Sequence, residues 1–198
     1  MPYVIGLTGN IATGKSVVLG MLKELGAKTI DADALAHELM RRGSPVWKAV
    51  VEEFGPEILG PDGEIDRKRL GRIAFSDPAA LRRLEELVHP AVIAATRELI
   101  RRYEGKVVAI EAIKLIEAGM RSIYDALWVV NCRKEQQLAR LMAQRELSRE
   151  EALLRIEAQP PQEEKVALAD VVIDNSGSLE ETRRQVEAEW SKIECSNR

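Results

Sequence analysis

Residues 5–22 read IGLTGNIATGKSVVLGML, with two glycines, a lysine and a serine between two apolar runs. Gly9, Gly14, Lys15 and Ser16 match G-x-x-x-x-G-K-[ST] at every fixed position, directly after a strand-like run and before a helical pattern. The glycines allow a sharp turn, so that consecutive N–H groups point into one concavity and the helix N-terminus adds positive potential. The stretch therefore predicts a nucleoside triphosphate site, with Lys15 at the β- and γ-phosphates and Ser16 as a ligand of Mg²⁺.

Five short apolar or β-branched runs indicate strands. Their apolar residues are continuous, which is typical of parallel strands covered on both faces. After the glycine turn, apolar side chains recur at helical spacing and Gly26 marks the stop. An α/β fold with a five-stranded parallel sheet flanked by helices is expected. The strand runs are residues 3–8, 27–31, 106–112, 126–132 and 170–175, and the helical face is Val17, Val18, Met21, Leu22 and Leu25.

Two intervals are too long for simple crossovers between strands. Residues 33–104 hold several helical stretches and a bend rich in glycine and proline, and residues 133–168 form a helical block rich in Arg, Gln and Glu. We interpret both as insertions over the C-terminal edge of the sheet, where open α/β sheets bind ligands. The chain is expected to be one domain, with a core of about 1–32, 105–132 and 169–198.

Composition restricts the classes of partner. The chain has 198 residues and a formal net charge of −3, which gives no bulk attraction to nucleic acid or to an anionic membrane. It shows no signal peptide and no apolar run near the ~20 residues of a membrane span. Cys132 and Cys195 have no metal-ligand spacing, and reduced thiols are expected. We therefore expect a cytoplasmic protein without nucleic-acid, membrane or obligate protein partners.

Other motifs distinguish the classes of protein that have such a phosphate loop (P-loop). The chain contains neither the guanine-reading N-K-x-D of GTPases nor the L-S-G-G-Q of transport ATPases. A D-x-x-G match begins at Asp174, on the last strand, which is too late in the chain for a GTPase. A kinase for a small acceptor remains the best class.

Two aspartates end the second strand run. Asp31 and Asp33 are expected at the C-terminal edge of the sheet, where a carboxylate can orient an acceptor hydroxyl and take its proton. The alternative role for Asp33 is capping of the helix that follows. Both roles can coexist, one for each aspartate.

A polar stripe runs along residues 133–144 beside an apolar face. Arg133, Gln137, Arg140 and Gln144 recur at helical spacing. Such a stripe is usually solvated, but in a kinase a mobile helix with arginines can also hold the transferring phosphoryl group and exclude water. The following SREE, residues 148–151, predicts a capping box.

His89 before Pro90 is expected, from the residues alone, to mark a hinge.

Taken in order, these stretches resemble the dephospho-coenzyme A kinase family nearly from end to end. The resemblance implies a P-loop kinase core with a coenzyme-binding helical insertion and a helical lid, residues 133–168. It implies transfer of the ATP γ-phosphoryl group to the ribose 3′-hydroxyl of dephospho-coenzyme A. The stretches are IGLTGNIATGKS, IDADALAHEL, FGPEIL, DGEIDRKRL, IAFSDP, LEELVHP, the Q and R of EQQLARL, and ADVVIDNSG.

The resemblance also implies roles for single residues. Asp33 matches the general base, Asp31 the neighbouring acid that serves Mg²⁺, and Arg140 the lid arginine directed at the phosphates. His89 and Pro90 match a motif on the coenzyme side. Lys114 and Leu115 lie where the chain leaves the family pattern, in the expected acceptor pocket. Lys114 is expected either to contact the anionic groups of the coenzyme, which is slightly favoured, or to pair with Glu117 three residues on. The implied ATP contacts are Gly9, Asn10, Ile11, Ala12, Thr13, Gly14, Lys15, Ser16, Val17, Asn175 and Gly177.

The chain departs from the family pattern in two places. In the phosphate loop, Ala12, Thr13 and Val17 replace a Gly, a Ser and a Thr, none of which is a fixed position of the signature. After the third strand, residues 113–117 read IKLIE where the family has Pro-Leu-Leu-x-Glu. The alternative functions are another small-molecule P-loop kinase, acting on a nucleoside monophosphate or an alcohol, and a silent nucleotide-binding regulator. Retention of Lys15, Ser16, Asp33 and Arg140 argues against the silent regulator.

Overall fold

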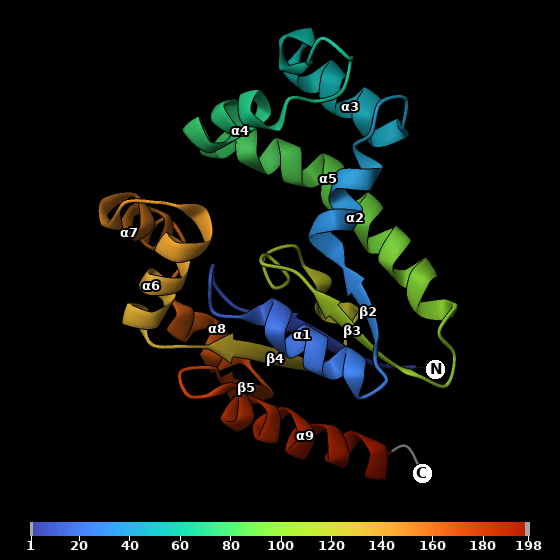
Figure 1. The fold of residues 1–198 in the computed structure, drawn as a ribbon. Helices are drawn as coiled ribbons and strands as arrows, with labels where there is room; N and C mark the ends of the chain where they lie inside the picture. The colour runs from blue at the N-terminus through green and yellow to red at the C-terminus, as the bar shows by residue number, and fades with distance from the viewer. Residues whose placement is uncertain (1, 197–198) are drawn as a thin grey trace. The chain divides into compact units, whose positions relative to one another are not determined.

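The computed structural model describes residues 2–196, apart from the side chains of Phe75 and Ser196. The chain divides into two compact units. Unit 1 holds the residues up to Ile30 and those from Tyr103 on, and unit 2 is Asp31–Arg102. Each unit is described by itself below (Figure 1).

Unit 1 is built on a five-stranded parallel sheet, as predicted. The strand order is β2-β3-β1-β4-β5, so β1 is central and pairs with both β3 and β4. The central strands are almost fully buried, whereas the edge strands β2 and β5 are partly exposed. The strands are β1 (Tyr3–Thr8), β2 (Lys28–Asp31), β3 (Val107–Glu111), β4 (Ala126–Asn131) and β5 (Val171–Asp174).

Helices cover both faces of this sheet. On one face α1 and α9 pack together and join the apolar side chains of β1, β4 and β5 in the main hydrophobic core. On the other face α8 packs against β4. The helices of unit 1 are α1 (Lys15–Glu24), η2 (Met120–Ser122), α6 (Lys134–Arg145), α7 (Arg149–Glu157), α8 (Gln162–Leu168) and α9 (Leu179–Ser196).

The helical face predicted for α1 is only partly correct. Val18, Met21 and Leu22 are buried in the core, but Val17 is 40% exposed. Val17 lies in the first turn of α1, one residue before the buried stripe begins, so it faces away from the sheet.

Unit 2 is helical, and one of its helices is continuous where the sequence predicted a hinge. The helix α5 continues through His89 and Pro90, where a hinge was expected. Proline removes one N–H from a helix and usually kinks it, but packing against α2, α3 and α4 supports α5 along its length. The helices are α2 (Ala32–Leu39), α3 (Pro45–Phe54), η1 (Pro56–Ile58), α4 (Arg67–Ser76) and α5 (Pro78–Arg101).

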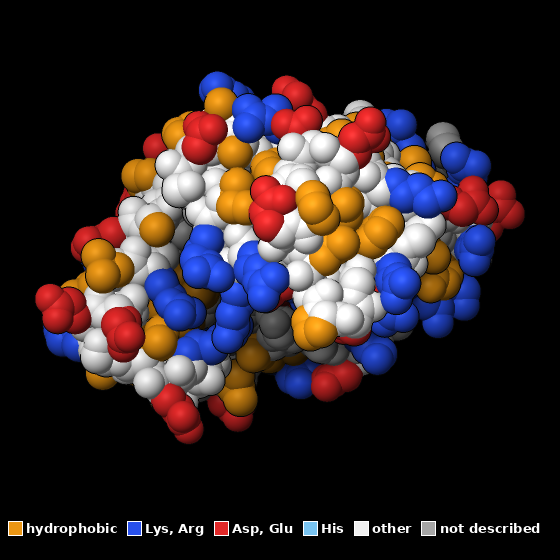
Figure 2. Space-filling model, turned by 90° about the horizontal axis from the view of Figure 1, so that it is seen from above, with side chains coloured by type: hydrophobic (Ala, Val, Ile, Leu, Met, Phe, Trp, Pro, Cys, Tyr) orange, Lys and Arg blue, Asp and Glu red, His pale blue; other side chains and the backbone are white. Residues whose placement is uncertain are grey.

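The surface carries charged side chains of both signs. Figure 2 shows Lys and Arg beside Asp and Glu on the viewed face, with hydrophobic side chains exposed in small separate groups. Among residues 2–196, no helix is long and apolar enough to cross a membrane.

Candidate active site

The phosphate loop leads from β1 into α1, and its shape depends on two glycines. Gly14, the N-cap of α1, has a φ of 97°, a left-handed conformation that glycine adopts without strain. A Cβ on Gly14 would lie 2.0 Å from Asn175 Nδ2, and a Cβ on Gly9 would lie 2.5 Å from the carbonyl oxygen of Val130. Both glycines are therefore required by close packing as well as by the turn.

Ala12, which stands where the resembled loop pattern has a glycine, has a left-handed backbone conformation. Its φ is 59°, in the left-handed region that L residues avoid. The sequence showed the substitution but not that the position has a positive φ. Ala12 also packs against the apolar cluster of α6 and α7, which includes Leu138 and Ile156. The methyl group thus gains contacts while the backbone carries strain.

Lys15 is held over the loop. Its side chain is 7% exposed, and Nζ donates to the carbonyl oxygen of Asn10 at 3.3 Å. The Thr13 hydroxyl donates to the same oxygen at 3.0 Å. An ammonium group kept close to the loop backbone is near the place where the first N–H groups of α1 lack intrahelical acceptors. This end of the loop can therefore hold an anion.

The N–H groups of Asn10 and Ile11, early in the loop, donate to glutamine side chains. Asn10 N–H donates to Gln162 Oε1 at 2.9 Å, and Ile11 N–H donates to Gln159 Oε1 at 2.7 Å. These donors are used inside the protein, and the contacts of Asn10 and Ile11 with ATP stay predictions. The N–H groups that remain for phosphate lie further along the loop, toward Gly14.

Arg140 contacts the phosphate loop directly. Its guanidinium group donates to the carbonyl oxygens of Thr13 at 3.3 Å and Asn175 at 2.8 Å. Burial raises the pKa of the Cys132 thiol, and the neighbouring Arg140 guanidinium acts in the opposite direction. Arg140 is thus at the edge of the phosphate loop, held by two carbonyl oxygens.

The polar stripe of α6 is only partly solvated. Gln137 is 6% exposed, and its Nε2 donates to the carbonyl oxygen of Ile11 at 2.6 Å. Arg133 and Gln144 are exposed. The stripe therefore divides into a half that holds the loop, Gln137 with Arg140, and a half that faces solvent. The capping box at Ser148 and Glu151 is present as predicted.

The side chain of Asn175, one of the implied ATP contacts, makes hydrogen bonds inside the protein. It is 2% exposed. Nδ2 donates to the carbonyl oxygen of Thr13 at 2.9 Å, and Oδ1 accepts from the Thr182 hydroxyl at 3.0 Å. Asn175 therefore ties the phosphate loop to α9, and its contact with ATP stays a prediction.

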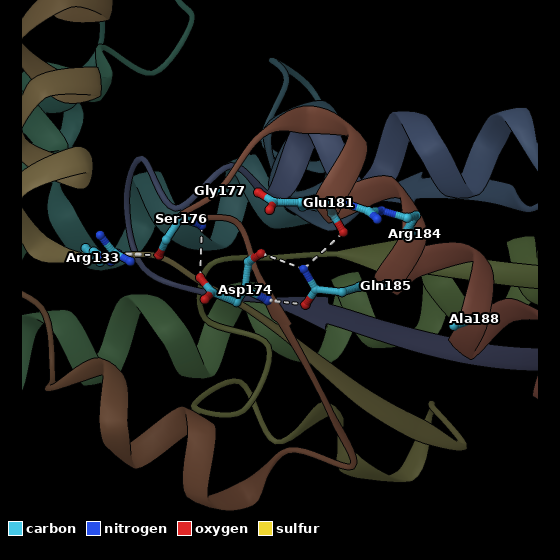
Figure 3. Close-up of a pocket in the computed structure, with 8 residues that line it drawn as sticks. All are labelled: Arg133, Asp174, Ser176, Gly177, Glu181, Arg184, Gln185 and Ala188. Atoms are coloured by element: carbon cyan, nitrogen blue, oxygen red, sulfur yellow. Dashed lines mark hydrogen bonds between the residues drawn. The ribbon is translucent and has the colours of Figure 1, made fainter.

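Gly177 lines a cavity of about 630 Å³ beside the start of α9 (Figure 3). Gln185 pairs with the backbone of Asp174 through two hydrogen bonds, Asp174 N–H to Oε1 at 2.9 Å and Nε2 to the carbonyl oxygen at 2.8 Å. Arg133 N–H donates to Ser176 Oγ at 3.0 Å. The lining is Arg133, Asp174, Ser176, Gly177, Glu181, Arg184, Gln185 and Ala188.

The loop after β3 carries the remaining predicted contacts of unit 1. Leu115 is fully buried and lies under Gly6, where an added Cβ would approach it to 2.8 Å. Leu115 is thus part of the core beside β1, and its contact with the acceptor stays a prediction. The neighbouring Lys114 is partly exposed, and Glu117 forms an ion pair with Lys165 at 3.1 Å.

In unit 2, the aspartate that caps α2 is Asp31. Its Oδ1 accepts from Ala34 N–H at 2.8 Å, while Asp33 lies inside the first turn and is exposed. The capping role considered for Asp33 therefore belongs to Asp31. His37 lies one turn after Asp33 and was not singled out from the sequence. Partial burial and the Arg67 guanidinium lower the pKa of His37, whereas Asp33 and Asp31 raise it. The i, i+4 spacing of Asp33 and His37 was the available signal.

His89 and Pro90 lie on α5, with His89 partly buried and Pro90 exposed. Three residues of unit 1 that the sequence did not single out, Gln159, Gln162 and Lys165, contact the loops at the sheet edge. Nothing in their local pattern distinguishes them from surface residues. Within residues 2–196, no group of three or more His, Cys, Asp or Glu side chains could hold a metal ion.

Comparison with known proteins gives a consistent result. Residues 3–181 match the family described as dephospho-CoA kinase. A dephospho-CoA kinase of Symbiobacterium thermophilum is 50% identical over 190 residues, 94% of this chain and 80% of that protein. One from Geobacter metallireducens is 48% identical over 192 residues, 96% of each chain.

Solved structures agree with this match. The dephospho-CoA kinase from Campylobacter jejuni has a TM-score of 0.73 and 30% identity, with both chains fully covered. The shikimate kinase from Acinetobacter baumannii has a TM-score of 0.56 at 16% identity, which shows a shared fold alone. Since the family match spans most of the chain, and relatives near 50% identity cover more than nine tenths of it, the chain belongs to the dephospho-CoA kinase family.

Proposed function

We propose that this chain transfers the γ-phosphoryl group of ATP to the ribose 3′-hydroxyl of dephospho-coenzyme A, giving coenzyme A and ADP. The observation that carries the proposal is the phosphate loop, with Lys15 buried over it and Arg140 at its edge, in a chain that matches the family over residues 3–181.

The phosphates of ATP would bind at the start of α1. Lys15 and the N–H groups near Gly14 supply positive charge there, since the Asn10 and Ile11 donors are already used. Arg140 would exchange its carbonyl partners for phosphate oxygens, because a guanidinium binds phosphate more strongly than a neutral carbonyl. Charge that spreads over the transferring group would be stabilised by these cations.

Asp33 is the proposed general base. It is exposed in the first turn of α2. The acceptor 3′-oxygen would lose its proton to Asp33 and attack the γ-phosphorus, and the bond from the γ-phosphorus to the β,γ-bridging oxygen would break to release ADP.

Mg²⁺ would neutralise charge on the transferred phosphates. The Ser16 hydroxyl fits as a ligand, since Ser16 is exposed at the second position of α1 and oxygen ligands are what Mg²⁺ prefers. Asp31 keeps its second carboxylate oxygen outside the capping bond with Ala34 and stays a predicted ligand.

The test is ADP release, measured by a coupled assay with a panel of acceptors. Dephospho-coenzyme A should stimulate release, while AMP, shikimate and simple alcohols should not exceed the background. Stimulation by AMP with none by dephospho-coenzyme A would assign the chain to nucleotide kinases instead.

A further inference from the structure

Residues 159–165, which we call the brace segment, run from the turn after α7 into the first residues of α8 and contact the ends of neighbouring strands. Gln159 and Gln162 accept the N–H groups of Ile11 and Asn10, at 2.7 and 2.9 Å. Gln162 Nε2 also donates to the carbonyl oxygen of Val130 at 3.0 Å. One short segment therefore holds the phosphate loop after β1 and the end of β4.

The last residue of the brace segment reaches a third loop. Lys165 Nζ donates to the carbonyl oxygen of Ile113 at 2.7 Å and pairs with Glu117 Oε1 at 3.1 Å. The lysine side chain is 4% exposed, whereas that of Glu117 is 36% exposed. Because a buried ammonium is costly without partners, these two contacts fix where residues 113–117 can lie.

The loop of residues 113–117 is held at both ends by this lysine. At its start, the carbonyl oxygen of Ile113 also accepts from the Thr8 hydroxyl at 3.2 Å. At its end stands Glu117, and Lys114 lies between the two anchors. The loop follows the carboxyl end of β3, the side of a parallel sheet where ligands bind. A shift of Lys165 would therefore move the backbone that carries Lys114.

We propose that Lys165 is a positioning residue for acceptor binding, and that the brace segment links the phosphate loop to the loop of residues 113–117. The proposal rests on the proposed function, because it takes residues 113–117 as part of the acceptor site. The Lys165 side chain itself is buried. It acts through the position of the loop, so its loss should raise the KM for the acceptor more than the KM for ATP.

The test is a kinetic comparison of Lys165→Met with wild type. Met keeps the length of the buried side chain and removes its charge and donors. The expected result is a rise of about tenfold in KM for dephospho-coenzyme A, with less than about twofold change in KM for ATP. Lys165→Arg, which keeps a charged donor, should recover most of the acceptor affinity.

Two further variants separate positioning from general folding. Lys134→Met is the matched control, since Lys134 pairs with Glu157 at 3.4 Å on the exposed surface of α6 and α7. It should leave both KM values unchanged. Glu117→Gln should raise the acceptor KM, and the double variant with Lys165→Met should be no worse than Lys165→Met alone, because both changes remove the same contact. If Lys165→Met does not fold, Glu117→Gln carries the test.

An acceptor KM within about twofold of wild type for both Lys165→Met and Glu117→Gln would overturn the proposal. Equal rises in the two KM values would also overturn it, since Lys165 would then serve the fold of the whole unit. Failure of the proposed function is seen separately, as wild-type protein that releases no ADP with dephospho-coenzyme A.

Discussion

Replacing Arg140 with alanine should weaken both folding and catalysis, in two measurements that can be separated. In the structure the guanidinium donates to the carbonyl oxygens of Thr13 and Asn175. A hydrogen bond from a charged group contributes about 1.5–3 kcal/mol when it is shielded. Arg140 is partly exposed, so water can replace some of this, and we expect a loss of about 2 kcal/mol in the free energy of unfolding.

For a chain of this size, that loss corresponds to a fall of roughly 4–8 °C in Tm, measured by calorimetry without ligand. The kcat should fall by about 10² or more, because the arginine would no longer neutralise the transferring group. Arg145→Ala is the control: Arg145 is exposed in the last turn of the same helix, and its loss should cost roughly 0.5 kcal/mol and no activity.

Two results would contradict the expected roles of Arg140. An unchanged Tm would mean that the two carbonyl contacts contribute nothing in solution. A normal kcat at saturating substrates, together with a lower Tm, would make Arg140 a structural residue of the lid and would exclude its action on the phosphates.

Three further predictions concern single positions. Asp33→Asn should lower kcat by about 10²–10⁴ while ATP binding, followed by calorimetric titration, is retained; more than a third of wild-type kcat would remove Asp33 as the base. Lys114→Leu, which restores the family residue, should raise the KM for dephospho-coenzyme A several-fold, most at low salt; no change in KM or its salt dependence would make Lys114 a surface residue. Ala12→Gly should remove the strain of a φ of 59° but lose contacts with Leu138, so Tm should change by less than about 3 °C; a fall of 8 °C or more would show that packing dominates.

The main elements of the fold could be predicted because their signals are local. Continuous apolar runs identified all five strands, and the pattern from Gly9 to Ser16 located the turn into α1. The course of α5 through Pro90 was missed, since the proline rule is also local and packing against α2, α3 and α4 outweighs it here.

The site was predictable where chemistry depends on a motif and unpredictable where it depends on long-range contacts. Lys15 and Arg140 follow from residue type and spacing. The use of Asn10 and Ile11 N–H groups by Gln162 and Gln159 does not, because the partners are about 150 residues apart in the chain. The hydrogen bonds of the buried Asn175 side chain with Thr13 and Thr182 likewise come only from the tertiary structure.

The central claim concerns which atom receives the phosphoryl group. Incubation of the purified chain with ATP, Mg²⁺ and dephospho-coenzyme A, followed by ³¹P NMR of the products, tests it most directly. The account predicts stoichiometric ADP and a new phosphomonoester on the ribose 3′-oxygen, with no such product from a Lys15→Met variant. Inorganic phosphate in place of the monoester, or phosphate on another acceptor atom, would contradict the account.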